Sequence, residues 1–149
     1  MTENAASETL SIALFSEMFM AGQLARNALS RALPKGMELS HFSVLNHLAH
    51  SAGPKSPAQL ARAFHLTRGA MTNTLTKLEW AGHVHIHPDW EDARRKIVTI
   101  SPAGRAARDA ALQAITPILA DVVDSIGEQK VRTALPVLRE LRERFGEKD

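Results

Sequence analysis

The sequence predicts a mainly α-helical fold with one small β-hairpin. Three observations in this 149-residue chain lead to that prediction. Apolar residues recur at helical spacing toward both ends, two capped helical segments follow one another in the middle, and the apolar period changes from helical to alternating after Gly82. We expect one domain, 1–149, because this length suits a single folding unit with a sizeable core.

The composition is that of an ordinary globular protein. Hydrophobic residues make up 44% of the chain and charged residues 23%. No apolar run approaches the roughly 20 residues that span a bilayer, and the N-terminus lacks the basic start of a secretory signal. We therefore expect no membrane association and a cytoplasmic location. The absence of cysteine excludes disulfides, thiolate metal ligands and thiol redox switches.

Two helices are expected in the first third of the chain. Apolar residues at helical spacing over 8–33 predict a long first helix, which ends at Leu33-Pro34-Lys35-Gly36. Ser40 is expected to cap a second helix, and Gly53-Pro54 to close it. The inward stripe of this second helix consists of Phe42, Leu45, Leu48 and Ala49.

The next segments predict a helix-turn-helix. Ser56-Pro57-Ala58-Gln59 has the pattern of a capping box, so a short helix over about 57–64 is expected. Thr67 is a suitable cap for a further helix over about 68–81, with Gly82 placed to end it. Two helices joined by a tight turn form a helix-turn-helix.

A hairpin is expected directly after this unit. Val84 and Ile86 alternate with histidines, and Lys96-Ile97-Val98-Thr99-Ile100 alternates again after a polar loop over 88–95. A hairpin with a charged tip beside a helix-turn-helix is a wing. We therefore expect a winged helix-turn-helix core over residues 37–101.

Two further helices complete the predicted fold. Ser101-Pro102 starts a helix by the same logic as Ser56-Pro57, and Pro117 should bend it before it ends at Gly127. The last helix covers about 128–145 and carries another irregularity at Pro136.

The two ends carry more apolar helical surface than a small winged core needs. We interpret residues 8–36 and 102–149 as N- and C-terminal dimerisation helices that flank the core. The alternative is that these helices fold back onto their own core.

The helix after Thr67 carries a polar face suited to DNA. With Met71, Leu75 and Leu78 turned inward, a helical wheel turns small polar residues outward. Asparagine and arginine can pair with base edges in the major groove, and threonine and lysine reach bases or phosphates. The alternative is a face that meets only water. The candidate DNA contacts on this helix are Thr67, Arg68, Gly69, Thr72, Asn73, Thr76 and Lys77.

The tip of the hairpin adds a group of cations. Arg94, Arg95 and Lys96 are consecutive, and residues 55–96 carry a net charge of +3 when histidine is counted as neutral. A wing arginine can enter a narrow minor groove, where the negative potential is enhanced. Asp92 is expected to pair with an arginine and hold the shape of the wing, whereas its alternative role is that of an ordinary turn residue.

Two patterns in this region match a known family. Its wing pattern is an Asp, one residue, an Arg, a strand ending in Leu-Thr and a following Gly. Asp92-Ala93-Arg94, Val98-Thr99-Ile100-Ser101 and Gly104 match it conservatively, although His85-Ile86-His87 replaces the basic residues that many members carry. The second pattern lies on the helix before the wing, and its residues are Thr72, Leu75, Leu78 and Gly82.

The chain thus resembles the MarR family of bacterial regulators. The resemblance implies a homodimer, formed by the first helix and the last two, that binds a pseudo-palindromic operator in double-stranded DNA. It also implies a small aromatic or anionic effector in a cleft between the dimerisation helices and the winged core. The candidate lining residues are Phe15, Met18, Phe19, Met20 and His41, for which the alternative is a core position.

The function expected from the sequence is therefore that of a transcriptional regulator, acting as a repressor, and not that of an enzyme. No glycine-rich phosphate loop or nucleophile elbow is present, and no cofactor is expected. His83-Val84-His85-Ile86-His87 and the pair His47 and His50 have spacings that can hold zinc, but neither has an obvious carboxylate partner. The alternative function is a winged-helix dimer that serves as a protein-interaction module through Trp80 and Trp90.

Overall fold

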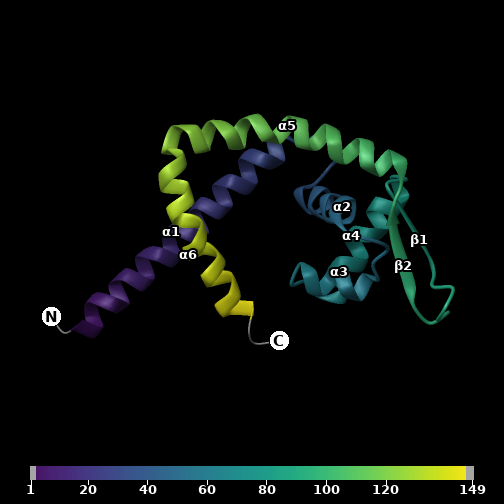
Figure 1. Cartoon of the computed structure of the whole chain (residues 1–149), viewed down its shortest axis with the longest axis horizontal. Helices are drawn as coiled ribbons and strands as arrows, with labels where there is room; N and C mark the ends of the chain where they lie inside the picture. The colour runs from purple at the N-terminus through teal and green to yellow at the C-terminus, as the bar shows by residue number, and fades with distance from the viewer. Residues whose placement is uncertain (1–2, 147–149) are drawn as a thin grey trace.

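The computed structural model describes residues 3–146 and confirms the predicted mainly helical fold with one hairpin. Figure 1 shows a group of short helices beside the hairpin, one long helix above them, and two further helices that extend away. The elements in chain order are α1 (Glu3–Ala32), α2 (Leu39–His50), α3 (Pro57–Ala63), α4 (Arg68–Trp80), β1 (Val84–Pro88), β2 (Lys96–Ile100), α5 (Pro102–Ile126) and α6 (Glu128–Gly146).

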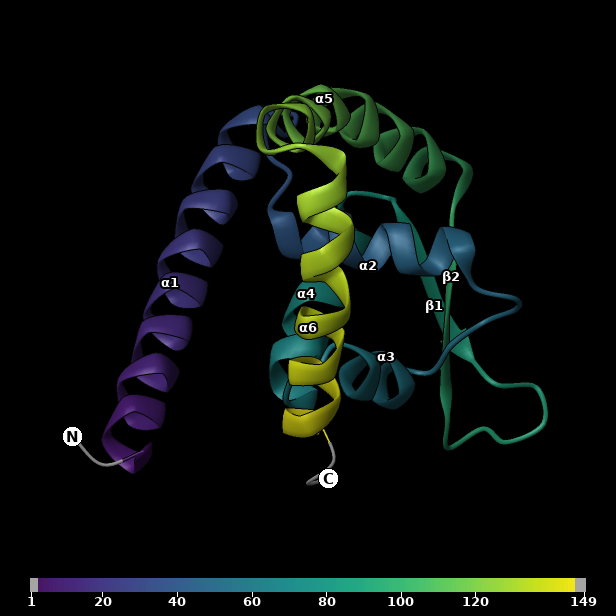
Figure 2. The same cartoon turned by 60° about the vertical axis from the view of Figure 1, so that its left-hand side comes forward.

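Residues 39–100, which hold α2 to β2, form a compact group that we call the winged unit. α5 crosses above it, and α6 turns away from α5 by 105°. Figure 2 shows α1 and α6 descending from α5 like two arms, and we call these two helices the helical arms. No single helix within residues 3–146 is long and apolar enough to cross a membrane; α5 and α6 meet that test only as a bent pair.

Three helices begin at the caps that the sequence predicts. Ser56 and Gln59 form the capping box of α3: the Ser56 hydroxyl accepts from the Gln59 amide at 3.1 Å, and the Gln59 side chain accepts from the Ser56 amide at 2.9 Å. Thr67 caps α4 by accepting from the Ala70 amide at 3.1 Å. Ser101 caps α5. These local signals are strong because each satisfies an amide that the first helical turn leaves unpaired.

The start of α2 differs from the prediction that Ser40 caps it. The N-cap is Glu38, and its backbone amide donates to Nδ1 of His41 at 3.3 Å in a capping box of unusual composition. Ser40 lies inside the helix because the Glu38–His41 pair satisfies the first turn two residues earlier. α1 also starts earlier than expected, at Glu3, and α5 runs through Pro117 as one helix.

The hairpin is antiparallel and extends by one bridge toward the helix-turn-helix. Val84 pairs with Ile100 and Ile86 with Val98. Lys55, just before α3, exchanges backbone hydrogen bonds with Val98, at 2.7 and 3.3 Å. The bridge fixes the start of α3 against the wing, so the two cannot drift apart without breaking it.

The main core lies inside the winged unit. Its side chains come from α2, α3, α4 and both strands, and the most deeply buried are Leu45, Leu60, Met71, Leu75, Leu78, Val84 and Val98. A smaller cluster of Leu33, Phe42, Ala111 and Ile115 joins the end of α1 and α2 to α5. Neither helical arm contains a buried residue. The winged unit therefore has its own core, whereas the arms are attached to it at their α5 ends.

Candidate nucleic-acid interface

The exposed face of α4 is arranged as the helical wheel predicts. Met71, Leu75 and Leu78 are buried, and the predicted contact residues between Arg68 and Lys77 are exposed. Asn73 is exposed, and its side-chain amide makes no hydrogen bond within residues 3–146, so its donor and its acceptor are both available to a ligand. Thr76 donates its hydroxyl to the Thr72 carbonyl at 2.9 Å. The face therefore presents small polar groups that a base edge could reach.

Gly69 lies in the first turn of α4, whereas Thr67 precedes the helix as its N-cap. Gly69 lies on the exposed face, and a Cβ atom there would meet nothing within 4 Å. The Thr67 hydroxyl is occupied by the Ala70 amide, so Thr67 acts in this structure as the cap of α4.

Asp92 organises the tip of the wing. Its carboxylate accepts from the Arg94 amide at 3.1 Å, and its carbonyl accepts from the Arg95 amide at 2.9 Å. Nε of Arg94 lies 3.5 Å from the same carboxylate oxygen, but the Arg94 side chain is 94% exposed, so solvent screens this ion pair. Asp92 therefore meets an arginine as predicted, and its firmer contacts are those with the backbone.

α4, the wing and the start of α3 surround one cavity of about 340 Å³, which we call the basic hollow. Its lining comes from residues 56–58, from Arg68 and Thr72, and from the wing cations 94–96. Four cationic side chains thus border one space, and no carboxylate within residues 3–146 lines it. A second hollow beside it continues toward the hairpin, and its polar lining includes Thr72, Thr76 and Lys96 together with the carboxylate of Glu79. Such clustering of cations with small polar groups suits a phosphate backbone and the groove beside it.

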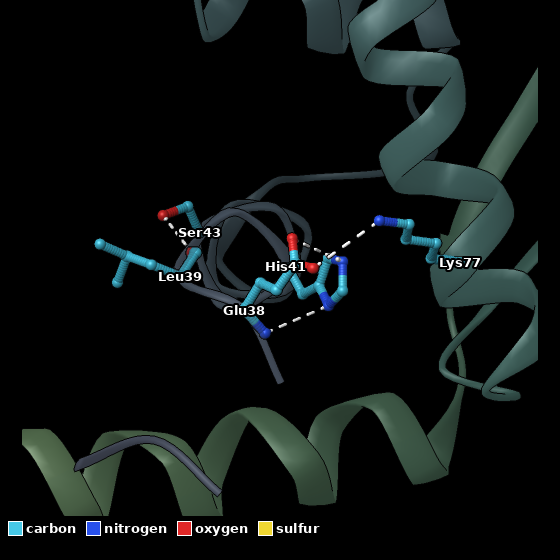
Figure 3. A network of polar contacts seen from close by, with 5 residues as sticks. All are labelled: Glu38, Leu39, His41, Ser43 and Lys77. Atoms are coloured by element: carbon cyan, nitrogen blue, oxygen red, sulfur yellow. Dashed lines mark hydrogen bonds and ion pairs between the residues drawn. The ribbon is translucent and has the colours of Figure 1, made fainter. Parts of the chain in front are cut away.

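Lys77 does not belong to this cluster. Its Nζ lies 3.7 Å from Oε1 of Glu38 at the start of α2, as Figure 3 shows. It lines a different cavity, on the side of α4 that faces α2 and α5. The side chains of Lys77 and Glu38 are both more than half exposed, so solvent screens this ion pair, and a DNA contact through Lys77 stays a prediction.

The start of α5 approaches the hairpin so closely that only glycine fits there. A Cβ atom on Gly104 would collide with the carbonyl oxygen of His83. Ser101 closes the same joint by donating its hydroxyl to the Gly82 carbonyl at 2.6 Å while it caps α5. The glycine of the wing pattern therefore joins α5 to the winged unit.

The family model described as "MarR family" matches residues 35–95, which run from just before α2 to the tip of the wing. The winged part of the chain thus matches the MarR family, and the fold is that of solved MarR-family structures. Members of this family are transcriptional regulators, not enzymes.

The relatives that match this chain are named as transcriptional regulators. "Transcriptional activatory protein BadR" of Rhodopseudomonas palustris is 29% identical over 109 residues, which are 70% of this chain and 62% of BadR. The chain thus spans less than two thirds of that relative's length.

Solved structures of MarR-family proteins share the fold. The transcriptional regulator BldR from Sulfolobus solfataricus has a TM-score of 0.81 and 25% identity, covering 97% of this chain and 99% of BldR. A mutant MarR from E. coli, complexed with operator DNA, has a TM-score of 0.80 and 23% identity, covering 87% of this chain and 94% of that one.

A cavity of about 540 Å³ lies between the α1–α2 connection, α4 and α5. Its polar lining includes Lys35, His41, Lys77 and His83, and most of its surface is apolar. Burial lowers the pKa of His41; Glu38 opposes this shift, and Lys77 and His83 add to it. His41 is therefore held neutral, with Nδ1 accepting from the Glu38 amide (Figure 3).

The structure does not bring the other candidate effector residues to His41. Phe15, Met18 and Phe19 lie on α1 and do not line this cavity. The ring of Phe15 instead lies 5.6 Å from that of Phe145 in α6, and Phe19 is 71% exposed. Met20, on the same helix, does not line the cavity either, because α1 diverges from the winged unit as an arm, and one cleft lined by all five candidates stays a prediction.

The histidines with zinc-compatible spacing have other neighbours. His47 packs edge-on against Phe64, with ring centres 5.3 Å apart. Nε2 of His50 lies 2.8 Å from the Arg108 guanidinium, which also donates to Asn46 at 3.1 Å. No group of three potential metal-binding side chains gathers within residues 3–146.

The Arg108 contacts escaped the sequence analysis. Arg108 joins α5 to α2, and the two helices are 58 to 62 positions apart in sequence at these contacts. No local pattern in a sequence marks such a pairing.

Proposed function

We propose that this protein is a sequence-specific, double-stranded DNA-binding transcriptional regulator. The observation that carries the proposal is the basic hollow, where α4 and the wing meet around Arg68, Thr72 and residues 94–96. In this arrangement α4 enters the major groove with Asn73 and Thr76 toward base edges, while Arg94 and Arg95 enter the adjacent minor groove. The related fold of the E. coli MarR mutant complexed with operator DNA supports this use of the surface.

We propose that the active form is a homodimer on a pseudo-palindromic operator. Large hydrophobic side chains stand exposed along both helical arms and the adjoining part of α5, where one chain leaves them without cover. The most exposed of them include Leu10, Ile12, Phe19, Leu24, Val122, Ile126, Leu138 and Phe145. A second copy covers all of them at once if the interface is two-fold, because each chain then offers the same surface.

We propose that a small aromatic or anionic effector binds the cavity beside His41. Its volume of about 540 Å³ suits a small molecule. Lys35 supplies positive charge for an anionic group, whereas the charge of Lys77 is offset by Glu38, which also lines the cavity, and the apolar lining suits an aromatic ring. Because the cavity touches both α4 and α5, an occupant there could change the distance between the two copies of α4 and weaken the fit to the operator.

We propose repression as the sign of regulation, because a dimer bound across a promoter blocks access to it. The relative from R. palustris is named as an activatory protein, so the sign needs a direct test. A reporter gene placed behind the selected operator measures it: repression predicts higher expression when the protein is deleted. Action on chromosomal DNA also implies a cytoplasmic location.

Selection of bound duplexes from random DNA tests the proposed function. The expected result is an enriched sequence with two related halves, whose centres are about 10–10.5 base pairs apart or a multiple of that spacing. If no sequence is enriched and no duplex is bound at low salt, the protein is not a DNA reader. The protein-interaction module then becomes the better account, with exposed Trp80 and Trp90 as its surface.

A further inference from the structure

Trp90 stands at the tip of the wing and is 95% exposed. No other large hydrophobic side chain within residues 3–146 is more exposed. An indole ring offers a large, rigid contact area when a partner covers it. The sequence alone left Trp90 as a candidate for protein interaction, and its place in the wing points to another partner.

Hydrogen bonds to the backbone hold the loop that carries Trp90. The Asp89 amide donates to the Arg95 carbonyl at 2.9 Å and closes the loop at its base. The Glu91 amide donates to the Asp89 carboxylate at 3.0 Å, and Asp92 holds the amides of Arg94 and Arg95. These hydrogen bonds hold the backbone on both sides of Trp90 at the tip of the wing, and the ring itself is exposed.

The charges at the tip of the wing cancel. Asp89, Glu91 and Asp92 oppose Arg94, Arg95 and Lys96, so residues 88–96 carry no net formal charge. The cations line the basic hollow, whereas Trp90 lies on the opposite, acidic limb of the loop. Attraction to phosphates therefore acts on only one limb of the tip, and any DNA contact by the other limb has to come from an uncharged side chain.

We propose that Trp90 is this contact, and that its indole packs against sugars and base edges in the minor groove next to the segment that α4 reads. The inference rests on the proposed DNA-binding function. Proteins that enter the minor groove commonly place apolar side chains there beside arginines. Tryptophan suits the task because it offers a large rigid surface and loses little rotamer freedom on contact.

Fluorescence can follow Trp90 directly. The chain has two tryptophans and no tyrosine, so Trp80→Phe leaves Trp90 as the sole indole. The probe is a duplex of roughly 30 base pairs, long enough for two half-sites, recovered by the wild-type protein from random DNA. On binding, we expect Trp90 emission to shift to shorter wavelength or be quenched, and its access to acrylamide to fall.

Affinity measurements separate an apolar contact from a charge effect. In the Trp80→Phe background, Trp90→Ala should weaken binding about tenfold, as for loss of an aromatic contact with nucleic acid. The slope of log K against log salt should stay the same, because no phosphate contact is lost. Trp90→Phe is the matched control and should retain most of the affinity. Arg94→Ala should lower the slope by about one.

The outcomes distinguish this inference from the proposed function. If the wild-type protein binds no duplex, the proposed function fails and the Trp90 contact fails with it. If the wild type binds but Trp90→Ala binds equally well, the contact is overturned, whether or not emission changes, and the wing tip is left for a protein partner. A reduced salt slope in Trp90→Ala would also overturn it, since the indole would then act only by positioning Arg94. Unchanged thermal unfolding of Trp90→Ala is expected because the ring is exposed.

Discussion

The winged unit and the helical arms differ in how well a single chain buries their apolar side chains. In the winged unit, side chains from three helices and two strands close a core whose members, from Val44 to Val98, are almost fully buried. In the arms, α1 has 30 residues and α6 has 19, and neither buries one. Both regions contain many apolar residues at helical spacing. The difference shows that the winged unit closes its own core, whereas the arms leave apolar surface exposed, which a second copy covers in the dimer that we propose.

A charge on the arms' surface should have the largest effect. Val122, at the α5 end of this surface, is 50% exposed, and Val122→Asp would place a carboxylate where the second copy packs. We expect a monomer by sedimentation and a loss of operator affinity of at least about 100-fold, because the two half-sites would be bound separately. Leu138→Asp should act in the same way.

Val122→Ile is the control for this substitution, since it keeps the surface apolar and should keep the dimer. An intact dimer with Val122→Asp and with Leu138→Asp would show that this surface does not join two copies. The exposed apolar residues of the arms would then need another explanation.

The joint between the two regions should be the next most sensitive place. Gly104→Ala sets a methyl group against the His83 carbonyl, so α5 must shift relative to the hairpin. We expect the free energy of unfolding to fall by about 3 kcal/mol, as in severe overpacking. Gly69→Ala is the matched change in open space on α4 and should raise stability by about 0.5–1 kcal/mol. Urea unfolding measures both free energies. If Gly104→Ala did not lower the free energy of unfolding relative to Gly69→Ala, the joint would not be tight.

Arg94→Ala tests the wing side of the winged unit. Because Arg94 is exposed and reaches DNA by charge, we expect about tenfold weaker binding to all sequences and a salt slope reduced by about one. Titrations of one specific and one mixed-sequence duplex at several salt concentrations provide the measurement. Unchanged affinity and slope would remove the wing from the interface.

Substitution of His41 should have the smallest effect, a change in how stability depends on pH. Its pKa is lowered by burial, partly opposed by Glu38 and assisted by Lys77 and His83. The unfolded chain therefore takes up a proton from about pH 6.5 downward while the folded chain does not, so stability is full above this pH and falls as the pH drops through the lowered pKa.

His41→Gln should remove this acid sensitivity, because glutamine can accept the Glu38 amide in the same capping box without titrating. Thermal unfolding from pH 7.5 to pH 5 compares the two proteins. If both lose the same stability toward acid, His41 is not a source of the pH dependence.

The sequence predicted the features of the fold that local interactions determine. The caps at Ser56, Thr67 and Ser101 and the buried face of α4 follow from residues within one or two helical turns, and the structure shows them as expected. The family pattern also identified Gly104 before its contact with His83 was known.

What the sequence missed depends on elements that are distant along the chain. Lys77 sits on the flank of the α4 wheel, and only the position of Glu38 on α2 decides which way it turns. Phe15 and His41 have compatible chemistry for one cleft, but the divergence of α1 from the winged unit separates them. The bridge from Lys55 to Val98 joins segments more than 40 positions apart, and it aligns α3 with the wing to form the basic hollow.

The central claim is that the exposed face of α4 reads base sequence, and sequence selection with three proteins tests it most directly. The wild type should enrich a two-fold related site. Asn73→Ala should lose preference at one base pair in each half-site, worth about 1–3 kcal/mol, with non-specific affinity almost unchanged, because a side chain with no internal partner has lost its pairing with a base edge. Thr76→Ala should relax a different position. The same preference in all three proteins, or a uniform loss across all sequences, would contradict the claim.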